Sequence, residues 1–140
     1  MTDKQLRWLE NQLADNPYHY IFVVGHEPAY PAGWQRNYGD CLDRSPENRD
    51  RFWEILSKYQ VTAYLCGHTH SYLKQYIQTV WHINLAQLVE TDYHNSLANF
   101  IVNDDSIQIQ IFVPSGRLLD QFSLMPRNDA LSVKVSLFFL

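Results

Sequence analysis

Two segments of the chain carry apolar residues at helical spacing. Leucines recur every three or four positions over residues 3–15, until Pro17 stops the pattern. A second helix is predicted to start with Ser45 as its N-cap and Pro46 in its first position, and to end near Tyr59. The chain therefore contains at least two amphipathic helices, each with one face that must pack against another element.

The other apolar residues form short runs that are typical of strands. YIFVVG and VTAYLC flank the second helix, and continuous runs of this kind suit strands buried on both faces. The order strand, loop, helix, strand predicts a βαβ unit with parallel strands. After His70 the chain changes to shorter, partly alternating segments, which predict antiparallel strands: SYLKQYI, VWHINLA, SLANFIV, SIQIQIFV and RLLDQFSL.

Composition and charge exclude several classes of protein. The chain has 140 residues, 46% of them hydrophobic, which suits a single folded domain. A net charge of -4, without clusters of Lys or Arg, predicts no nucleic-acid-binding surface. No apolar run approaches the roughly 20 residues needed to cross a bilayer, so we expect no membrane partner. The N-terminal residues do not resemble a signal peptide, and the localisation stays open.

Two histidines follow glycines at the ends of the two predicted parallel strands. IFVVGH ends at His26, AYLCGH ends at His68, and His70 comes two residues later. Neighbouring parallel strands lie roughly 4.8 Å apart and present ligands at their carboxyl ends, so His26 and His68 should reach one ion, or two nearby ions. Each glycine would allow a sharp turn before its histidine. If Thr69 is extended, His70 points the same way as His68, and the three histidines predict a metal site.

The type of ligand limits the choice of metal. Neutral imidazoles suit Zn, Fe, Ni or Cu better than Mg or Ca. Three histidines could form one mononuclear zinc site, whereas a two-metal site would also need bridging carboxylates, and no DxH or GDxxD motif ahead of His26 supplies them. His19, His82 and His94 do not follow a strand and a glycine, so we interpret them as ordinary residues. His82 or His94 could still hydrogen-bond to a ligating residue.

The stretches VVGHEPAY and YLCGHTHSY resemble the last two motif blocks of the calcineurin-like metallophosphoesterases, a superfamily that includes the purple acid phosphatases. The resemblance implies an α/β fold that forms part of a four-layer α/β/β/α sandwich, with a βαβ unit followed by antiparallel strands. It also implies two transition-metal ions, Fe, Zn or Mn, in the complete site. By position, His26 and His68 would bind the second metal and His70 the first.

The sequence departs from the family pattern in its missing motifs. The earlier blocks DxH, GDxxD and GNHE, which supply the other ligands and a proton-donating histidine, do not occur ahead of His26 in this chain. Residues 1–125 therefore resemble the C-terminal half of a metallophosphoesterase domain, and residues 126–140 form a tail or an edge strand. Half a sandwich should expose apolar sheet surface around Ile21, Val23, Tyr64 or their neighbours, so we expect an N-terminal half or a second copy as partner.

The resemblance implies phosphoester hydrolysis by a metal-bound hydroxide, with a small-molecule phosphoester or a phosphoprotein as substrate. We expect this chain alone to be incomplete or inactive. The alternative is an inactive metal-binding or regulatory module derived from the same fold. The loop over residues 27–44 would border the substrate, with Arg36 and Tyr38 as candidate contacts. Arg36 could bind phosphate in a bidentate manner, although a solvated charge explains it equally well.

Overall fold

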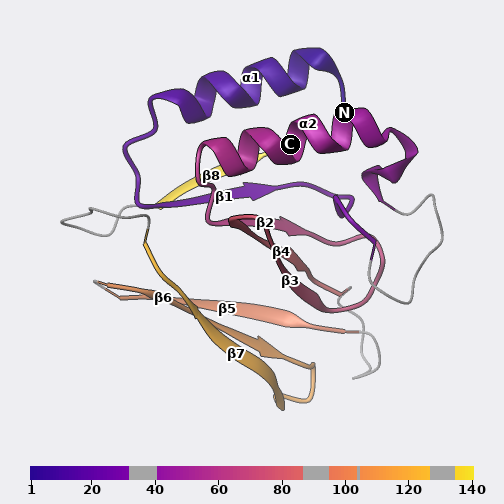
Figure 1. Cartoon of the computed structure of the whole chain (residues 1–140). Helices are drawn as coiled ribbons and strands as arrows, with labels where there is room; N and C mark the ends of the chain where they lie inside the picture. Colours follow the sequence, from indigo (N-terminus) through magenta and orange to yellow (C-terminus); the bar gives the residue numbers. More distant parts are fainter. Residues whose placement is uncertain (32–40, 87–94, 104, 127–134) are drawn as a thin grey trace.

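The protein folds into three layers in the computed structural model, which describes residues 1–31, 41–86, 95–103, 105–126 and 135–140. Two helices cover one face of a five-stranded sheet, and a three-stranded sheet lies over the other face (Figure 1). This arrangement confirms the predicted α/β class. The elements are α1 (Asp3–Ala14), β1 (Tyr20–Val24), the 3₁₀ helix η1 (Leu42–Arg44), α2 (Pro46–Lys58), β2 (Ala63–Cys66), β3 (Leu73–Ile77), β4 (Val80–Asn84), β5 (Leu97–Val102), β6 (Ile107–Phe112), β7 (Leu118–Leu124) and β8 (Val135–Phe139).

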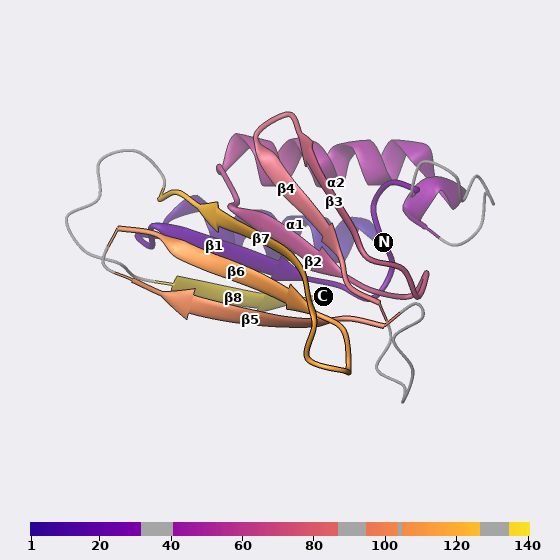
Figure 2. The same ribbon diagram turned by 90° about the horizontal axis from the view of Figure 1, so that it is seen from below.

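The five-stranded sheet has the strand order β3-β4-β2-β1-β8. Strands β1 and β2 are connected through α2 and pair directly in parallel, which confirms the βαβ unit. Strand β4 is also parallel to β2, and β8 is parallel to β1, whereas β3 runs antiparallel to β4. The segments after His70 therefore divide between two sheets. Only β5, β6 and β7 form the separate antiparallel sheet, which Figure 2 shows in front of the larger one.

The helices begin where the sequence predicts. The Thr2 side chain accepts the Gln5 N–H of the first turn, and the Gln5 side chain accepts the Thr2 N–H at 2.9 Å, so α1 starts with a capping box. Helix α2 has Pro46 at its start, where no N–H is needed. Ser45 is its N-cap residue, but among the described residues the Ser45 side chain makes no capping hydrogen bond.

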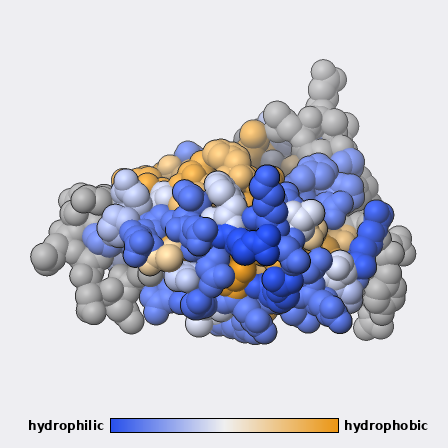
Figure 3. All heavy atoms as spheres, turned by 90° about the horizontal axis from the view of Figure 1, so that it is seen from above, coloured by the Kyte–Doolittle hydropathy of each residue, from blue (hydrophilic) through white to orange (hydrophobic). Residues whose placement is uncertain are grey.

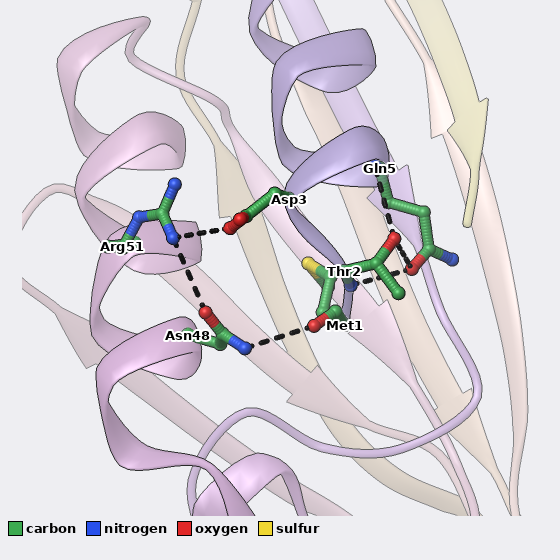
Figure 4. A network of polar contacts seen from close by, with 6 residues as sticks. All are labelled: Met1, Thr2, Asp3, Gln5, Asn48 and Arg51. Atoms are coloured by element: carbon green, nitrogen blue, oxygen red, sulfur yellow. Dashed lines mark hydrogen bonds and ion pairs between the residues drawn. The ribbon is translucent and has the colours of Figure 1, made fainter.

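The N-terminus of α1 is tied to α2 by polar contacts. Asn48 of α2 donates to the carbonyl of Met1 at 3.2 Å, and Arg51 forms an ion pair with Asp3 at 2.7 Å (Figure 4). The Arg51 guanidinium lowers the pKa of the Asp3 carboxyl. The ion pair is exposed and contributes little free energy, so apolar packing between the helices and the sheet holds this layer in place.

Two apolar cores lie on opposite faces of the five-stranded sheet. The helix-side core includes Ile21, Val23 and Tyr64, each at most 2% exposed, so these three residues do not form the predicted apolar surface themselves. Helices α1 and α2 cover them. Side chains from β6 instead fill the second core, beneath Phe22 of β1. The helices therefore bury one face of the five-stranded sheet, and the three-stranded sheet buries the other face where the two overlap.

Exposed apolar side chains occur along β8, the strand that pairs with β1, and along β5, at one side of the molecule. Leu137 is 51% exposed and Phe139 is 68% exposed on β8. An apolar groove of about 330 Å³ lies between the two sheets beside them, and its lining residues are Phe22, Val24, Leu65, Phe100, Val102, Ile107, Val135 and Leu137. The helix side is mostly hydrophilic, with a hydrophobic area along one margin (Figure 3). Within the described ranges, every helix is too short or too polar to cross a membrane.

Candidate metal centre

The carboxyl ends of β1 and β2 bring His26 and His68 together. Backbone pairing continues past both strands, because Gly25 donates to the Leu65 carbonyl and Gly67 donates to the His26 carbonyl, each at 3.0 Å. The two histidines therefore leave the sheet side by side. Nε2 of His26 lies 2.9 Å from Nδ1 of His68, and the ring centroids are 4.8 Å apart.

The two ring nitrogens lie close to the separation that a shared metal ion requires. Bonds from imidazole nitrogen to a first-row metal are about 2.0–2.1 Å long, so two such nitrogens on one ion lie about 3.0–3.4 Å apart at bond angles of about 90–110°. The observed 2.9 Å is a hydrogen-bond distance between the two rings, just short of that separation. His26 is exposed and His68 is partly exposed, so an ion and a substrate could approach from solvent. The two imidazoles thus fit the ion that the sequence predicts at this edge.

His70 is not gathered with the pair. The segment after β2 is a tight turn in which the Thr69 N–H donates to the Gly67 carbonyl at 2.8 Å, rather than an extended strand. His68 and His70 both have positive φ, 67° and 52°, so the two-residue alternation that would align them does not apply. Within the described ranges, no three His, Cys, Asp or Glu side chains are placed to hold one metal. His70 is exposed, and its role as a ligand stays a prediction.

Gly25 and Gly67 do not provide the sharp turns that the sequence predicts. Neither is at positive φ, and at the second motif His68 takes the left-handed conformation instead, which histidine adopts more readily than most residues. A Cβ on Gly67 would meet only the Leu85 carbonyl at 3.5 Å, an ordinary contact. A Cβ on Gly25 would lie 2.3 Å from the Tyr64 hydroxyl. Gly25 therefore allows a close approach of β2, not a turn.

Asn84, at the end of β4, supports the turn that carries His68. Its side chain is buried, donates to Thr69 Oγ1 at 2.7 Å and also donates to the Ser71 carbonyl. Because β4 is parallel to β2, Asn84 reaches the same edge of the sheet as the histidines. Sequence reasoning missed this residue. The sequence feature that could have indicated Asn84 is its position as a polar residue on the inward-facing side of a buried strand.

Two more buried side chains contact the loop that follows His26. Tyr64 donates its hydroxyl to the Glu27 carbonyl at 2.6 Å, and His82 Nε2 accepts the Ala29 N–H at 3.1 Å. Burial raises the pKa of the Tyr64 phenol and lowers the pKa of His82 to about 4. At neutral pH the phenol is therefore a donor, and the imidazole is neutral with an acceptor nitrogen. His82 thus holds loop backbone rather than a ligating side chain.

The loop beyond Pro31 reaches outside the described residues. Arg36 and Tyr38, the predicted substrate contacts, lie in the range 32–40, as does half of the predicted loop. Where the chain is described again, the Leu42 N–H donates to the Pro28 carbonyl at 2.9 Å. The loop is therefore anchored to the protein on both sides of that range.

Known proteins resemble this chain in sequence over about half of its length. The chain is 39% identical over 74 residues to tartrate-resistant acid phosphatase type 5 of Oryctolagus cuniculus, and 38% identical over the same length to the Homo sapiens enzyme. It is 35% identical over 75 residues to the 3',5'-cyclic adenosine monophosphate phosphodiesterase CpdA of Escherichia coli K12. These matches cover 53%, 53% and 52% of this chain, and 20%, 20% and 26% of the respective relatives.

A solved structure supports the fold over nearly the whole chain. Purple acid phosphatase PPD1 from yellow lupin (Lupinus luteus) matches with a TM-score of 0.64 and 16% identity, covering 98% of this chain and 28% of that one. The chain therefore spans about a fifth to about a quarter of its relatives' length. The family model of the calcineurin-like phosphoesterases matches residues 1–72, which include both histidine motifs. On this match over half of its length, the chain belongs to the calcineurin-like phosphoesterase family.

Proposed function

We propose that this chain is the C-terminal, metal-binding part of a metal-dependent phosphoester hydrolase, and that it is incomplete by itself. The fold is that of phosphoester hydrolases, as the family match and the acid phosphatase relatives indicate. The observation that carries the proposal is the 2.9 Å separation of His26 Nε2 and His68 Nδ1 at the ends of two parallel strands. This is where α/β sheets bind their ligands.

Each predicted residue has a distinct task in this proposal. His26 and His68, as neutral imidazoles, hold one transition-metal ion, and His70 binds a neighbouring ion when further ligands are supplied. A bound Fe, Zn or Mn ion would supply Lewis acidity toward a phosphoryl oxygen and lower the pKa of a water. Arg36 and Tyr38 stay proposed contacts to a small phosphoester or a phosphoprotein.

The missing ligands support the proposal that the site is completed by other residues. Two-metal hydrolysis uses carboxylates that hold the ions about 3.5–4 Å apart, together with a group that protonates the leaving oxygen. No DxH, GDxxD or GNHE motif precedes His26 in this chain to provide them. We therefore propose an N-terminal half of the catalytic domain as the partner, with a second copy of the chain as the alternative.

Metal titration tests the two-histidine site directly. Zn²⁺ and Co²⁺ affinities would be measured by calorimetry and Co²⁺ absorption for the parent chain, for His26→Ala and His68→Ala, and for His19→Ala as a matched control. We expect at least a tenfold loss of affinity in the first two variants, since each loses one of two ligands, and no change in the control. Equal affinities in all four proteins would refute the site.

A second assay tests incompleteness. The isolated chain with Mn, Zn or Fe should hydrolyse a nitrophenyl phosphate at or near the background rate. Robust multiple turnover that disappears in His70→Ala would contradict the proposal, because the site would then be complete without a partner. Activity that appears when a separately expressed N-terminal half is added would support it. Metal binding without activity in that mixture would favour the inactive binding module.

A further inference from the structure

The loop after His26 rests on a buried aromatic cluster that contains two polar groups. We call residues 25–31 the His26 loop. Beneath it, the Tyr64 ring stacks on His82 with centroids 5.9 Å apart, and meets the edges of Phe52 at 5.2 Å and Trp53 at 6.2 Å. These side chains come from α2, β2 and β4, so three elements fix the two polar groups.

The two polar groups bind loop backbone on the C-terminal side of His26. The Tyr64 hydroxyl holds the carbonyl of Glu27, the very next residue, and His82 Nε2 holds the N–H of Ala29. On the N-terminal side, Gly25 and the His26 carbonyl are held by backbone pairing with β2. Hydrogen bonds therefore fix the backbone before and after His26, and this holds its side chain in the direction of His68.

His82 is an unfavourable residue for stability alone. Its ring is fully buried, and Nδ1 has no hydrogen-bond partner among the described residues. Because Nε2 accepts a hydrogen bond, the proton of the neutral ring is on Nδ1, where it is left unsatisfied. An apolar side chain of similar size would avoid this cost. What a histidine adds here is the acceptor for the Ala29 N–H.

We propose that Tyr64 and His82 are positioning residues, which hold the backbone of the His26 loop so that His26 Nε2 stays beside His68 Nδ1. This inference rests on the proposed metal-binding role of the two histidines. Neither Tyr64 nor His82 touches the ion. Their effect is to keep the first ligand in place before the metal arrives, which lowers the cost of ordering the loop on binding.

The test uses the full chain and variants with small changes in hydrogen bonding; replacement of His82 also removes the 3.6 Å contact of Nε2 with Cys66 Sγ. Tyr64→Phe removes the hydroxyl and keeps the ring, His82→Leu removes the acceptor, and His82→Gln keeps an acceptor oxygen near the position of Nε2. Tyr20→Phe is the matched control, because the Tyr20 hydroxyl also donates to backbone carbonyls, at 3.2 Å and 3.4 Å, but at the other end of β1. The readouts are hydrogen exchange of the Ala29 amide by NMR without metal, Co²⁺ affinity, and global unfolding.

We expect Tyr64→Phe and His82→Leu to weaken Co²⁺ binding about tenfold, and His82→Leu to speed exchange of the Ala29 amide about tenfold or more. His82→Gln should restore both, and Tyr20→Phe should change neither. Unchanged exchange and affinity in the folded His82→Leu and Tyr64→Phe proteins would overturn the proposal. If His82→Leu does not fold, Tyr64→Phe decides by its Co²⁺ affinity. If no protein binds Co²⁺, faster exchange in His82→Leu that His82→Gln reverses still supports loop positioning, and only the metal-binding function fails.

Discussion

Replacement of Gly25 by alanine tests the close contact between the His26 loop and β2. The new Cβ would lie 2.3 Å from the Tyr64 hydroxyl and 3.0 Å from two ring carbons. The phenol cannot easily retreat, because its ring is 2% exposed and its hydroxyl is bonded to the Glu27 carbonyl. Gly25 is not at positive φ, so alanine suits the backbone, and the contact is the main source of strain.

The expected loss of stability follows from three contributions. Overpacking of a buried contact costs about 1–3 kcal/mol, and a weakened Tyr64–Glu27 hydrogen bond costs about 1 kcal/mol. Alanine restricts the unfolded chain and returns about 0.4–1 kcal/mol. The net expectation for Gly25→Ala is a loss of about 1–3 kcal/mol in the free energy of unfolding.

A double-mutant cycle isolates the contact with the hydroxyl. Tyr64→Phe removes the atom at 2.3 Å, so Gly25→Ala should cost about 1–2 kcal/mol less in the Tyr64→Phe variant than in the parent. Guanidinium unfolding with a metal chelator, followed by tryptophan fluorescence, measures the four free energies. Gly67→Ala is the control and should change stability by less than about 0.5 kcal/mol. Additive losses within about 0.5 kcal/mol would refute the reasoning.

Three further predictions concern other parts of the molecule. Burial lowers the pKa of His82 from 6.5 to about 4, so between these pH values the unfolded chain binds a proton that the folded chain does not. The free energy of unfolding should therefore fall by up to about 1.4 kcal/mol per pH unit as the pH drops from 6.5 toward 4, with no effect of this group at higher pH. Urea unfolding at several pH values should show a shallower dependence in His82→Gln, and equal slopes would contradict it. Asp120→Asn should cost about 1 kcal/mol and reduce the salt dependence of unfolding, because Asp120 accepts bonds from Lys74 at 2.7 Å and Tyr72 at 2.6 Å between the two sheets; an unchanged midpoint would rule this out. Phe139→Lys should lower the fluorescence of an apolar dye without changing the thermal midpoint, since Phe139 is 68% exposed on β8; unchanged dye binding would count against an accessible apolar strand.

Much of the architecture was predictable because it depends on short-range patterns. The leucine spacing before Pro17 and the pair Ser45 and Pro46 act within one or two helical turns, and both helices occur within one or two residues of the predicted ends. The two runs ending in Gly-His are strands for the same local reason. Their parallel pairing follows from the intervening helix, so the meeting of His26 and His68 was also accessible.

The sequence by itself thus determined the elements, the βαβ unit and the two histidines that meet at its edge. Only the tertiary structure decided that β4 and β8 join the first sheet in parallel, that the turn after Gly67 separates His70 from the pair, and that α1 and α2 cover Ile21 and Val23. It alone also places Tyr64 on Glu27, 37 positions away in sequence, and His82 on Ala29, 53 positions away. Periodicity reports which face of an element is buried, but not which distant group it meets there, because that depends on how all the layers pack together.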